Sequence, residues 1–492
     1  MDSDMLRSVV RQAIKEFDFS SNSEEIGIVV SVFDGIAMIS GLNNGTIDEV
    51  VIFNKEIIGT NRVITGIIMA MDENYVTVLI IGDYTQVSTQ DEVIRTKKTF
   101  KVNTSDAIIG RVVNGYGHPI DNLPEMKNGT DMKVDNNSPQ MIERSFITKQ
   151  LETGIKTIDM LIPIGLGQRQ LIVGDINTGK TQVALSTMIN NKDDKDFISI
   201  YVSIGQKINN APKYLNTLKK NNVKNFILVN ANSSDPVSMR YLAPMVGCSI
   251  GEYFRNKGKK VLIIYDDLNS HAVAYREISL ILKRPPGREA YPGDIFYLHS
   301  KLLERSAQMN GVYKHGSLTA LPIVTSFDGD ISSYIITNLI SITDGQIIFT
   351  QEDFAKNIYP AIKIGVSVSR VGGACQNIVL NKLISSIKIE LAKYEEYKEL
   401  TKMSQNITPE IKEILQHGNL IKKMLLQDLK PVSLWKQICI LYGLRNKMFN
   451  EYNIENFVRF IESLQKEKQN ILENYDCLSL IMKDYNPGDV YV

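Results

Sequence analysis

The sequence predicts an α/β protein whose core is a parallel sheet, with an all-β barrel before it and an α-helical bundle after it. Three changes of character along the 492 residues indicate this order. Short β-branched runs broken by turn residues fill positions 24–96, buried strands alternate with helical stretches over 97–376, and long helical patterns occupy 377–492. We expect three domains with these bounds after a separate segment of residues 1–23, because one core does not serve so long a chain.

The N-terminal segment has the pattern of an amphipathic helix. Leu6, Val10 and Phe17 are among the apolar residues at helical spacing over residues 1–19, and a polar linker follows at residues 20–23. Such a helix either docks on its own protein or serves as a handle for another subunit, and the pattern does not decide between them. No apolar stretch is long enough to cross a bilayer, so any membrane contact is expected to be indirect.

The second segment predicts a small closed barrel or sandwich. Asp34 with Gly35, and Asn44 with Gly45, are hairpin signals between strand runs. The segment contains no catalytic constellation. The expected strand runs are residues 27–30, 36–39, 50–53, 63–64 and 76–81.

A phosphate-binding loop (P-loop) is predicted early in the α/β domain. The segment from Gly174 to Thr181 follows the apolar run 171–173 and precedes apolar residues 183–185, which indicates a strand, a glycine-bracketed loop and a helix. The glycines let consecutive N–H groups point inward, Lys180 supplies a charge for the outer phosphates, and the Thr181 hydroxyl is placed for Mg²⁺. The expected contacts are Gly174, Asp175, Asn177, Thr178, Gly179, Lys180, Thr181 and Gln182.

A second ligand for Mg²⁺ is predicted at the end of a later strand. Strands are expected at residues 198–202, 226–229, 261–265 and 321–324, and the third of them ends at Asp266 and Asp267. An acid that ends a hydrophobic strand downstream of a phosphate loop holds the metal of a bound nucleotide, usually through water. We therefore expect ATP or ADP with Mg²⁺, held by Thr181 and Asp266.

Gln206 follows the next strand after the loop and stands where a nucleotidase would place a carboxylate. Hydrolysis of a phosphoanhydride needs a group that accepts or orients the proton of the attacking water. An amide can orient water but cannot accept its proton at neutral pH. Glutamine does serve some nucleotidases in this way, so the residue alone leaves catalysis open.

The third segment predicts four long helices, at residues 382–404, 408–426, 434–448 and 454–475, with Pro409 and Pro431 near helix starts and Trp435 packed in the bundle. Just before it, Arg370 lies among small residues, where it could act as a finger across a subunit boundary. Taken alone, a surface salt bridge is the simpler role for this arginine.

The composition disfavours several classes of protein. Fifty-five basic residues balance 55 acidic ones, so there is no electrostatic case for nucleic-acid binding. The four cysteines form no Cys-x-x-Cys pair, and the five histidines are dispersed, which indicates neither a disulfide framework nor a zinc site. A reducing compartment fits this pattern best.

Four motifs give the chain a family resemblance. Residues 284–294 read RPPGREAYPGD, and residues 264–268, 341–346 and 368–372 read IYDDL, SITDGQ and VSRVG. With the phosphate loop, they make the chain similar to the alpha-subunit family of F-type ATP synthases over nearly its whole length. The resemblance implies a RecA-like P-loop core in an alternating hexamer with beta subunits around a central gamma stalk.

The resemblance also implies roles for single residues. The alpha subunit would bind Mg-ATP without turnover, with Gln206 in the place of the catalytic glutamate of beta and Asp266 reaching the metal through water. Arg370 would be the finger that acts in the neighbouring beta site. The N-terminal helix would meet a delta-type peripheral-stalk subunit, and the complex would sit on the cytoplasmic face of a bacterial plasma membrane or the inner face of an organelle membrane.

The chain departs from the family mostly around the expected base of the nucleotide. Phe354 and Gln427 match expected base contacts, but Leu429 replaces a second glutamine, and Tyr359 and Phe327 replace an arginine and a glutamine. In the loop, Ile176 and Asn177 replace an Arg-Gln pair. These changes affect recognition of the base rather than of the phosphates and metal.

Two other functions fit parts of the pattern. The first is an alpha-like subunit of a divergent F-type-like ATPase that drives mechanical work instead of ion pumping. The second is a hexameric RNA translocase built on a related core, which the neutral charge and the lack of a basic aromatic motif disfavour.

Overall fold

The computed structural model describes residues 25–56, 63–124, 126, 129–403, 408–428, 430–449 and 453–485. The predicted N-terminal helix and its linker lie outside these residues, as does Leu429. The chain forms two compact units, one that ends at Phe100 and one that begins at Lys101, and each is considered by itself.

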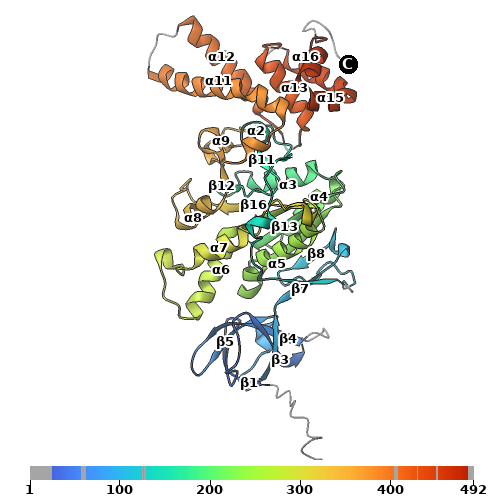
Figure 1. Ribbon diagram of the computed structural model, residues 1–492. Coiled ribbons are helices and arrows are strands. Elements are labelled where there is room, and N and C mark those ends of the chain that lie inside the picture. Colours follow the sequence, from blue (N-terminus) through green and yellow to red (C-terminus); the bar gives the residue numbers. More distant parts are fainter. Residues whose placement is uncertain are drawn as a thin grey trace, which may run out of the picture. The chain divides into compact units, whose positions relative to one another are not determined.

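The first unit is a closed antiparallel barrel with strand order β1-β2-β5-β4-β3-β6 (Figure 1). Its interior is filled by buried aliphatic residues and Phe53. The predicted hairpin at Asp34 and Gly35 is confirmed, because both residues have positive φ values, 42° and 82°, between the paired strands β1 and β2. The strands are β1 (Ile26–Phe33), β2 (Ile36–Ser40), β3 (Glu49–Glu56), β4 (Val63–Met71), β5 (Val76–Ile81) and β6 (Glu92–Thr99), with a 3₁₀ turn, η1 (Tyr84–Gln86).

The hairpin signal at Asn44 and Gly45 was wrong. These residues lie between β2 and β3, which do not pair, since β2 pairs with β1 and β5. The Asn44 N–H instead donates to the Glu25 carboxylate at 3.1 Å, and the Gly45 N–H donates to the Leu42 carbonyl. The pair therefore shapes a loop that crosses to another strand of the barrel.

The second unit is built on an eight-stranded sheet in the order β18-β17-β12-β16-β15-β13-β14-β8. The pairs from β17 to β8 are parallel, as predicted, and only the edge strand β18 runs antiparallel. The central strands are nearly continuous runs of buried residues, which is typical of a sheet covered on both faces. The strands are β8 (Val112–Asn114), β12 (Leu171–Gly174), β13 (Phe197–Gln206), β14 (Phe226–Asn232), β15 (Lys260–Asp266), β16 (Ser317–Thr325), β17 (Gly345–Ile348) and β18 (Val368–Ser369).

Helices and two small sheets complete this part of the second unit. The small sheets pair β7 (Lys101–Thr104) with β9 (Thr130–Lys133) and β10 (Gln150–Leu151) with β11 (Ile164–Gly165). The helices are α2 (Lys156–Leu161), α3 (Lys180–Asn190), α4 (Asn210–Lys220), α5 (Val237–Asn256), α6 (Leu268–Ile281), α7 (Ile295–Leu303), α8 (Tyr334–Ile342), α9 (Gln351–Ala355) and α10 (Gly372–Cys375).

The C-terminal part is helical, as predicted, but the fourth long helix is broken. The predicted residues 454–475 form α14 (Ile454–Ser463), η7 (Leu464–Glu467) and α15 (Lys468–Glu473), and a further helix that was not predicted follows as α16 (Tyr475–Met482). Asn474 separates the last two, because its side chain accepts the Asp476 N–H at 2.8 Å and starts a new helix. The other three predicted helices are α11 (Ile378–Met403), α12 (Pro409–Leu425) and α13 (Leu434–Arg445), and Trp435 is buried in their core, as predicted.

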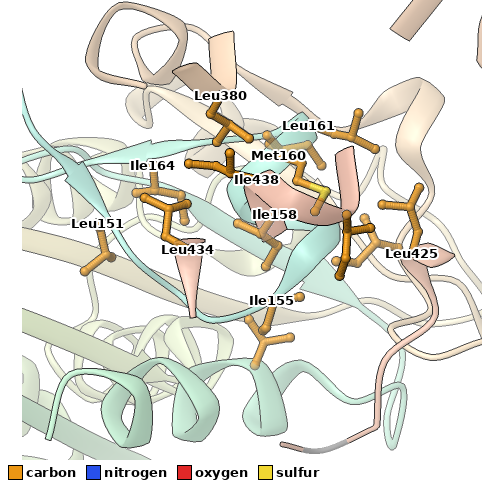
Figure 2. Packing of buried hydrophobic residues seen from close by; sticks show 14 of the residues in the cluster. Leu151, Ile155, Ile158, Met160, Leu161, Ile164, Leu380, Leu425, Leu434 and Ile438 are labelled. Atoms are coloured by element: carbon orange, nitrogen blue, oxygen red, sulfur yellow. The ribbon is translucent and has the colours of Figure 1, made fainter. Parts of the chain in front are cut away.

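The short helix α2 joins the sheet to the helical part through one continuous core. Every residue of α2 is buried. Figure 2 shows Ile158 and Met160 of α2 among Leu380 of α11 and Ile438 of α13. Because this contact is apolar and dense, the helical part is expected to move with the segment that contains α2.

Two buried polar contacts join α5, α6 and α7. Arg305, which is 2% exposed, donates to both carboxylate oxygens of Glu252 at 3.0 and 2.7 Å. Nδ1 of His271 lies 3.3 Å from Nε2 of His299, and Nε2 of His271 lies 3.1 Å from the Tyr241 carbonyl oxygen. Burial lowers the pKa of both histidines, to about 4 for His271, so both rings are neutral near pH 7.

Candidate functional site

The phosphate loop leaves the carboxyl end of the buried strand β12 and enters α3 at Lys180. Gly179 has a φ of 97° with no atom near an added Cβ, so the backbone conformation itself requires glycine there. At Gly174, an added Cβ would lie 2.6 Å from the Cβ of Phe349, so close packing requires glycine. The sequence therefore folds locally into the predicted strand, loop and helix.

Hydrogen bonds fix the shape of this loop. The Thr178 hydroxyl donates to the Asp175 carbonyl at 2.8 Å. The Asp175 carboxylate accepts the Ser326 hydroxyl at 2.6 Å and the Gly329 N–H at 3.0 Å, which ties the loop to the segment after β16. Asp175 thus positions the loop, and its carboxylate points toward that neighbouring segment.

Lys180 lies inside the loop. Its ammonium donates to the carbonyls of Gly174 at 2.6 Å and Asp175 at 2.5 Å, and the side chain is buried. Burial lowers the pKa of Lys180, although the carboxylates of Asp266 and Asp267 act in the opposite direction. An ammonium held by two carbonyls of the loop is suited to the outer phosphates of a nucleotide.

Asp266 contacts both Thr181, which was predicted to hold Mg²⁺ with it, and Gln206, which was predicted to orient water. Its carboxylate accepts the Thr181 hydroxyl at 3.1 Å, the Gln206 amide at 3.3 Å and the Tyr201 hydroxyl. Burial raises the pKa of Asp266 to about 6, against these hydrogen bonds. The structure thus brings together Thr181, Gln206 and Asp266 from three separate elements.

Two residues beside Asp266, namely Asp267 and Tyr201, had no role assigned from the sequence. The Asp267 carboxylate caps α6 by accepting the Ser270 N–H at 2.7 Å, and it also accepts the Thr325 hydroxyl at 2.8 Å. It is therefore occupied away from the loop. Tyr201 was not predicted as a site residue, because it is one of three hydroxyl-bearing residues, with Ser199 and Ser203, in the apolar run 197–204.

The expected base contacts form a second group at the same end of the sheet. The Phe349 N–H donates to the Val173 carbonyl at 2.8 Å, so α9 begins beside the phosphate loop. The rings of Phe354 and Tyr359 meet edge to face, with centroids 5.3 Å apart. The Gln427 N–H donates to the Tyr359 carbonyl at 2.9 Å, which brings the helical part to this group.

The substituted rim of the loop is apolar. Ile176 is 62% exposed and Phe327 is 67% exposed. Asn177 has a φ of 63°, a conformation that asparagine tolerates, and Gln182 is half-buried in the first turn of α3. Of the arginine, glutamine and second glutamine that the resemblance implies at the rim, two are thus replaced by the exposed hydrophobic side chains of Ile176 and Phe327, and one by Asn177.

Arg370 lies away from all of these residues. It follows the edge strand β18, in which Ser369 pairs with Gly345 at the start of β17. Because β17 and β12 are parallel and Ile348 pairs with Val173, the start of β17 lies at the amino ends of the strands. The phosphate loop leaves the opposite ends, about 13 Å away along the strands at a rise of about 3.3 Å per residue.

The Arg370 side chain is exposed. Its backbone N–H donates to the Asp344 carbonyl at 2.9 Å, and its Nη1 lies 3.5 Å from the Thr343 carbonyl oxygen, at the limit of a hydrogen bond. Arg370 is therefore fixed through its backbone, and its guanidinium reaches a carbonyl just before β17 rather than a residue of the phosphate loop.

A glycine-bracketed loop between a buried strand and a helix, with a strand-ending acid beside its threonine, defines a P-loop nucleotide-binding protein. Residues 154–369 match the profile of the ATP synthase alpha/beta family, nucleotide-binding domain, and residues 376–483 match that of the ATP synthase alpha/beta chain, C terminal domain.

Relatives of known identity match the chain almost end to end. ATP synthase subunit alpha of Ehrlichia chaffeensis is 42% identical over 487 residues, which cover 97% of this chain and 94% of the relative. The subunit alpha of Caldanaerobacter subterraneus is 42% identical (94% and 90% covered), and that of Wigglesworthia glossinidia brevipalpis is 41% identical (99% and 96% covered). The chain belongs to the family of F-type ATP synthase alpha subunits. Among the described residues, no helix is long and apolar enough to span a membrane.

Proposed function

We propose that this chain is the noncatalytic subunit of the ATP synthase head, which binds Mg-ATP or Mg-ADP without turning it over. Lys180 and the loop N–H groups would hold the phosphates, while the Thr181 hydroxyl and, through water, Asp266 would hold Mg²⁺. The fit rests on the 3.1 Å contact between Thr181 and Asp266, which places two oxygen donors at one point. Bound Mg²⁺ would neutralise charge on the phosphate oxygens.

The lack of turnover follows from Gln206. Its amide nitrogen donates to Asp266, and its amide oxygen accepts the Asn210 side chain at 3.1 Å. The amide has no proton-accepting capacity at neutral pH, so it can orient a water molecule but cannot deprotonate it. Asp266 does not replace it, because this carboxylate is committed to Thr181, Tyr201 and the metal.

The position of Arg370 is the observation that carries the proposal. The arginine is exposed at the amino ends of the strands, so it does not serve its own phosphate loop. Val366 and Val368, on the same segment, are also exposed. Exposed apolar side chains near Arg370 favour a contact with another subunit at this position. We infer that Arg370 enters the catalytic site of an adjacent beta subunit and stabilises charge on the transferring phosphoryl group.

The assembly that follows is an alternating hexamer with beta subunits around a gamma subunit. The N-terminal segment would meet a delta-type subunit of the peripheral stalk, and the complex would be a peripheral membrane assembly. Its expected location is the cytoplasmic face of a bacterial plasma membrane or the inner face of an organelle membrane.

The isolated full-length chain tests the noncatalytic role. We expect saturable Mg-ATP binding by equilibrium dialysis, with no release of phosphate above the rate in buffer. The variant Lys180→Ala is the control for binding at the loop. Steady hydrolysis by the beta-free chain that Lys180→Ala abolishes would contradict the role of Gln206, and absence of binding would contradict the nucleotide site.

A further inference from the structure

The side chain of Gln427 is fully engaged within the protein. Its amide nitrogen donates to the carbonyls of Gly154 at 2.7 Å and Lys430 at 2.8 Å, and its amide oxygen accepts the Lys156 N–H at 2.9 Å. The assignment of nitrogen and oxygen is fixed, because two partners are carbonyls and the third is an N–H group. Gln427 therefore joins the segment between α12 and α13 to the segment just before α2.

The surroundings of Gln427 hold it in this position. The buried ammonium of Lys156 donates to the carbonyls of Met424 and Leu426, and the Val432 N–H donates to the Gly154 carbonyl at 2.8 Å. Several hydrogen bonds on both sides of Gln427 thus join the segment between α12 and α13 to the segment just before α2. Turning the Gln427 amide toward a ligand would break three of them in a partly buried place.

A glutamine that recognises adenine must donate one N–H to a ring nitrogen and accept one from the exocyclic amino group. Gln427 has two amide hydrogens, and both are already donated to carbonyls. No donor remains for N1 of adenine, nor for O6 of guanine. The Gln427 side chain therefore cannot select adenine over guanine through a pair of hydrogen bonds to the base.

At this end of the sheet, the aromatic side chains of Tyr359 and Phe354 are available for stacking on a base. Tyr359 is 39% exposed, its ring packs against Phe354, and its hydroxyl donates to Asn357 at 3.2 Å. Because every base has a π face, stacking on an aromatic ring tolerates a change of base. A pocket without a dedicated hydrogen-bond partner likewise discriminates weakly between ligands of similar shape.

We propose that the nucleotide site of this chain takes purine nucleoside triphosphates without distinguishing adenine from guanine. Gln427 positions the segment before α2, and Tyr359 with Phe354 receives the base by stacking. The inference rests on the proposed function, since it assigns the specificity of the same nucleotide site.

Calorimetric titration of the full-length chain with Mg²⁺ and ATP, GTP or inorganic tripolyphosphate tests the inference. ATP and GTP are expected to bind with dissociation constants within about tenfold of each other, and both more tightly than tripolyphosphate. Tyr359→Ala should weaken ATP and GTP alike, by about tenfold, and leave tripolyphosphate unchanged. Gln427→Ala should lower the unfolding midpoint and leave the ratio of ATP to GTP affinity unchanged.

The possible results distinguish a failure of the base-tolerance inference from a failure of the proposed nucleotide-binding function. A preference for ATP beyond about tenfold, or a selective loss of ATP affinity in Gln427→Ala, overturns the base-tolerant site and leaves the nucleotide-binding role standing. Binding of no nucleotide at all overturns both. If Gln427→Ala does not fold, the wild-type ratio and the Tyr359→Ala comparison still decide the question.

Discussion

Replacing Arg370 by alanine separates a role in catalysis from a role in folding. Among the described residues, its one side-chain hydrogen bond reaches the Thr343 carbonyl at 3.5 Å, and the side chain is exposed. The loss should therefore cost the fold less than about 1 kcal/mol. A finger acting on a neighbouring phosphoryl group is worth about three to five powers of ten in rate, which is about 4 to 7 kcal/mol.

The expected loss of folding stability is much smaller than the expected loss of transition-state stabilisation, so a rate assay on the assembled complex distinguishes the two roles. The measurement is phosphate release by the complex reconstituted with beta and gamma subunits, alongside size-exclusion chromatography and thermal melting of the same preparation. Arg370→Lys is the matched control, which keeps the charge but loses the planar fork and should recover only part of the rate. Unchanged turnover in the assembled Arg370→Ala complex would remove the arginine from catalysis.

Three further variants test the remaining parts of the structure. Lys180→Ala should weaken Mg-ATP binding about 100-fold in equilibrium dialysis. The unfolding midpoint should stay nearly unchanged, because the protein loses only the hydrogen bonds from Lys180 to two loop carbonyls. A large shift of the midpoint with unchanged affinity would contradict this expectation. Arg305→Met should lower the free energy of unfolding by up to about 3 kcal/mol in urea titrations, because the buried Glu252 loses its two-point partner and keeps Arg255 at 3.8 Å and the Asn136 amide at 3.1 Å. The double variant with Glu252→Gln should recover part of the loss. The folded state holds His271 neutral to about pH 4, whereas the unfolded chain protonates it near pH 6.5, so stability is complete above pH 6.5 and falls as the pH drops toward 4. His271→Gln should make this fall shallower by up to about 1.4 kcal/mol per pH unit, and identical slopes would exclude the histidine.

Local features of the fold could be predicted from the sequence where apolar runs or glycines dictate them. The phosphate loop is such a case, because Gly174 and Gly179 act within one short segment. The strand β6 was missed, because its only aliphatic residues are Val93 and Ile94, of which Val93 alone is buried, and the polar run 95–99 follows them. The helix α16 was missed because the predicted helix ended at Tyr475, where the side chain of Asn474 in fact starts a new helix.

The site was predictable only as far as adjacent strand ends bring residues together. Thr181 follows β12, Gln206 ends β13 and Asp266 ends β15, and the carboxyl ends of these parallel strands lie at one edge of the sheet, so the meeting of the three residues follows from the topology. The tether from Gln427 to Gly154 joins residues far apart in the chain, and no periodicity encodes it. The placement of Arg370 at the opposite ends of the strands required the register of an edge strand that the sequence did not predict.

A structure of the assembled head with a transition-state analogue bound in the beta subunit tests the central claim most directly. The account predicts the Arg370 guanidinium within hydrogen-bond distance, about 3 Å, of the phosphoryl position in the neighbouring subunit. It also predicts intact Mg-ATP at the phosphate loop of this chain. An Arg370 side chain that faces bulk solvent, remote from any nucleotide of an adjoining protomer, would contradict the account.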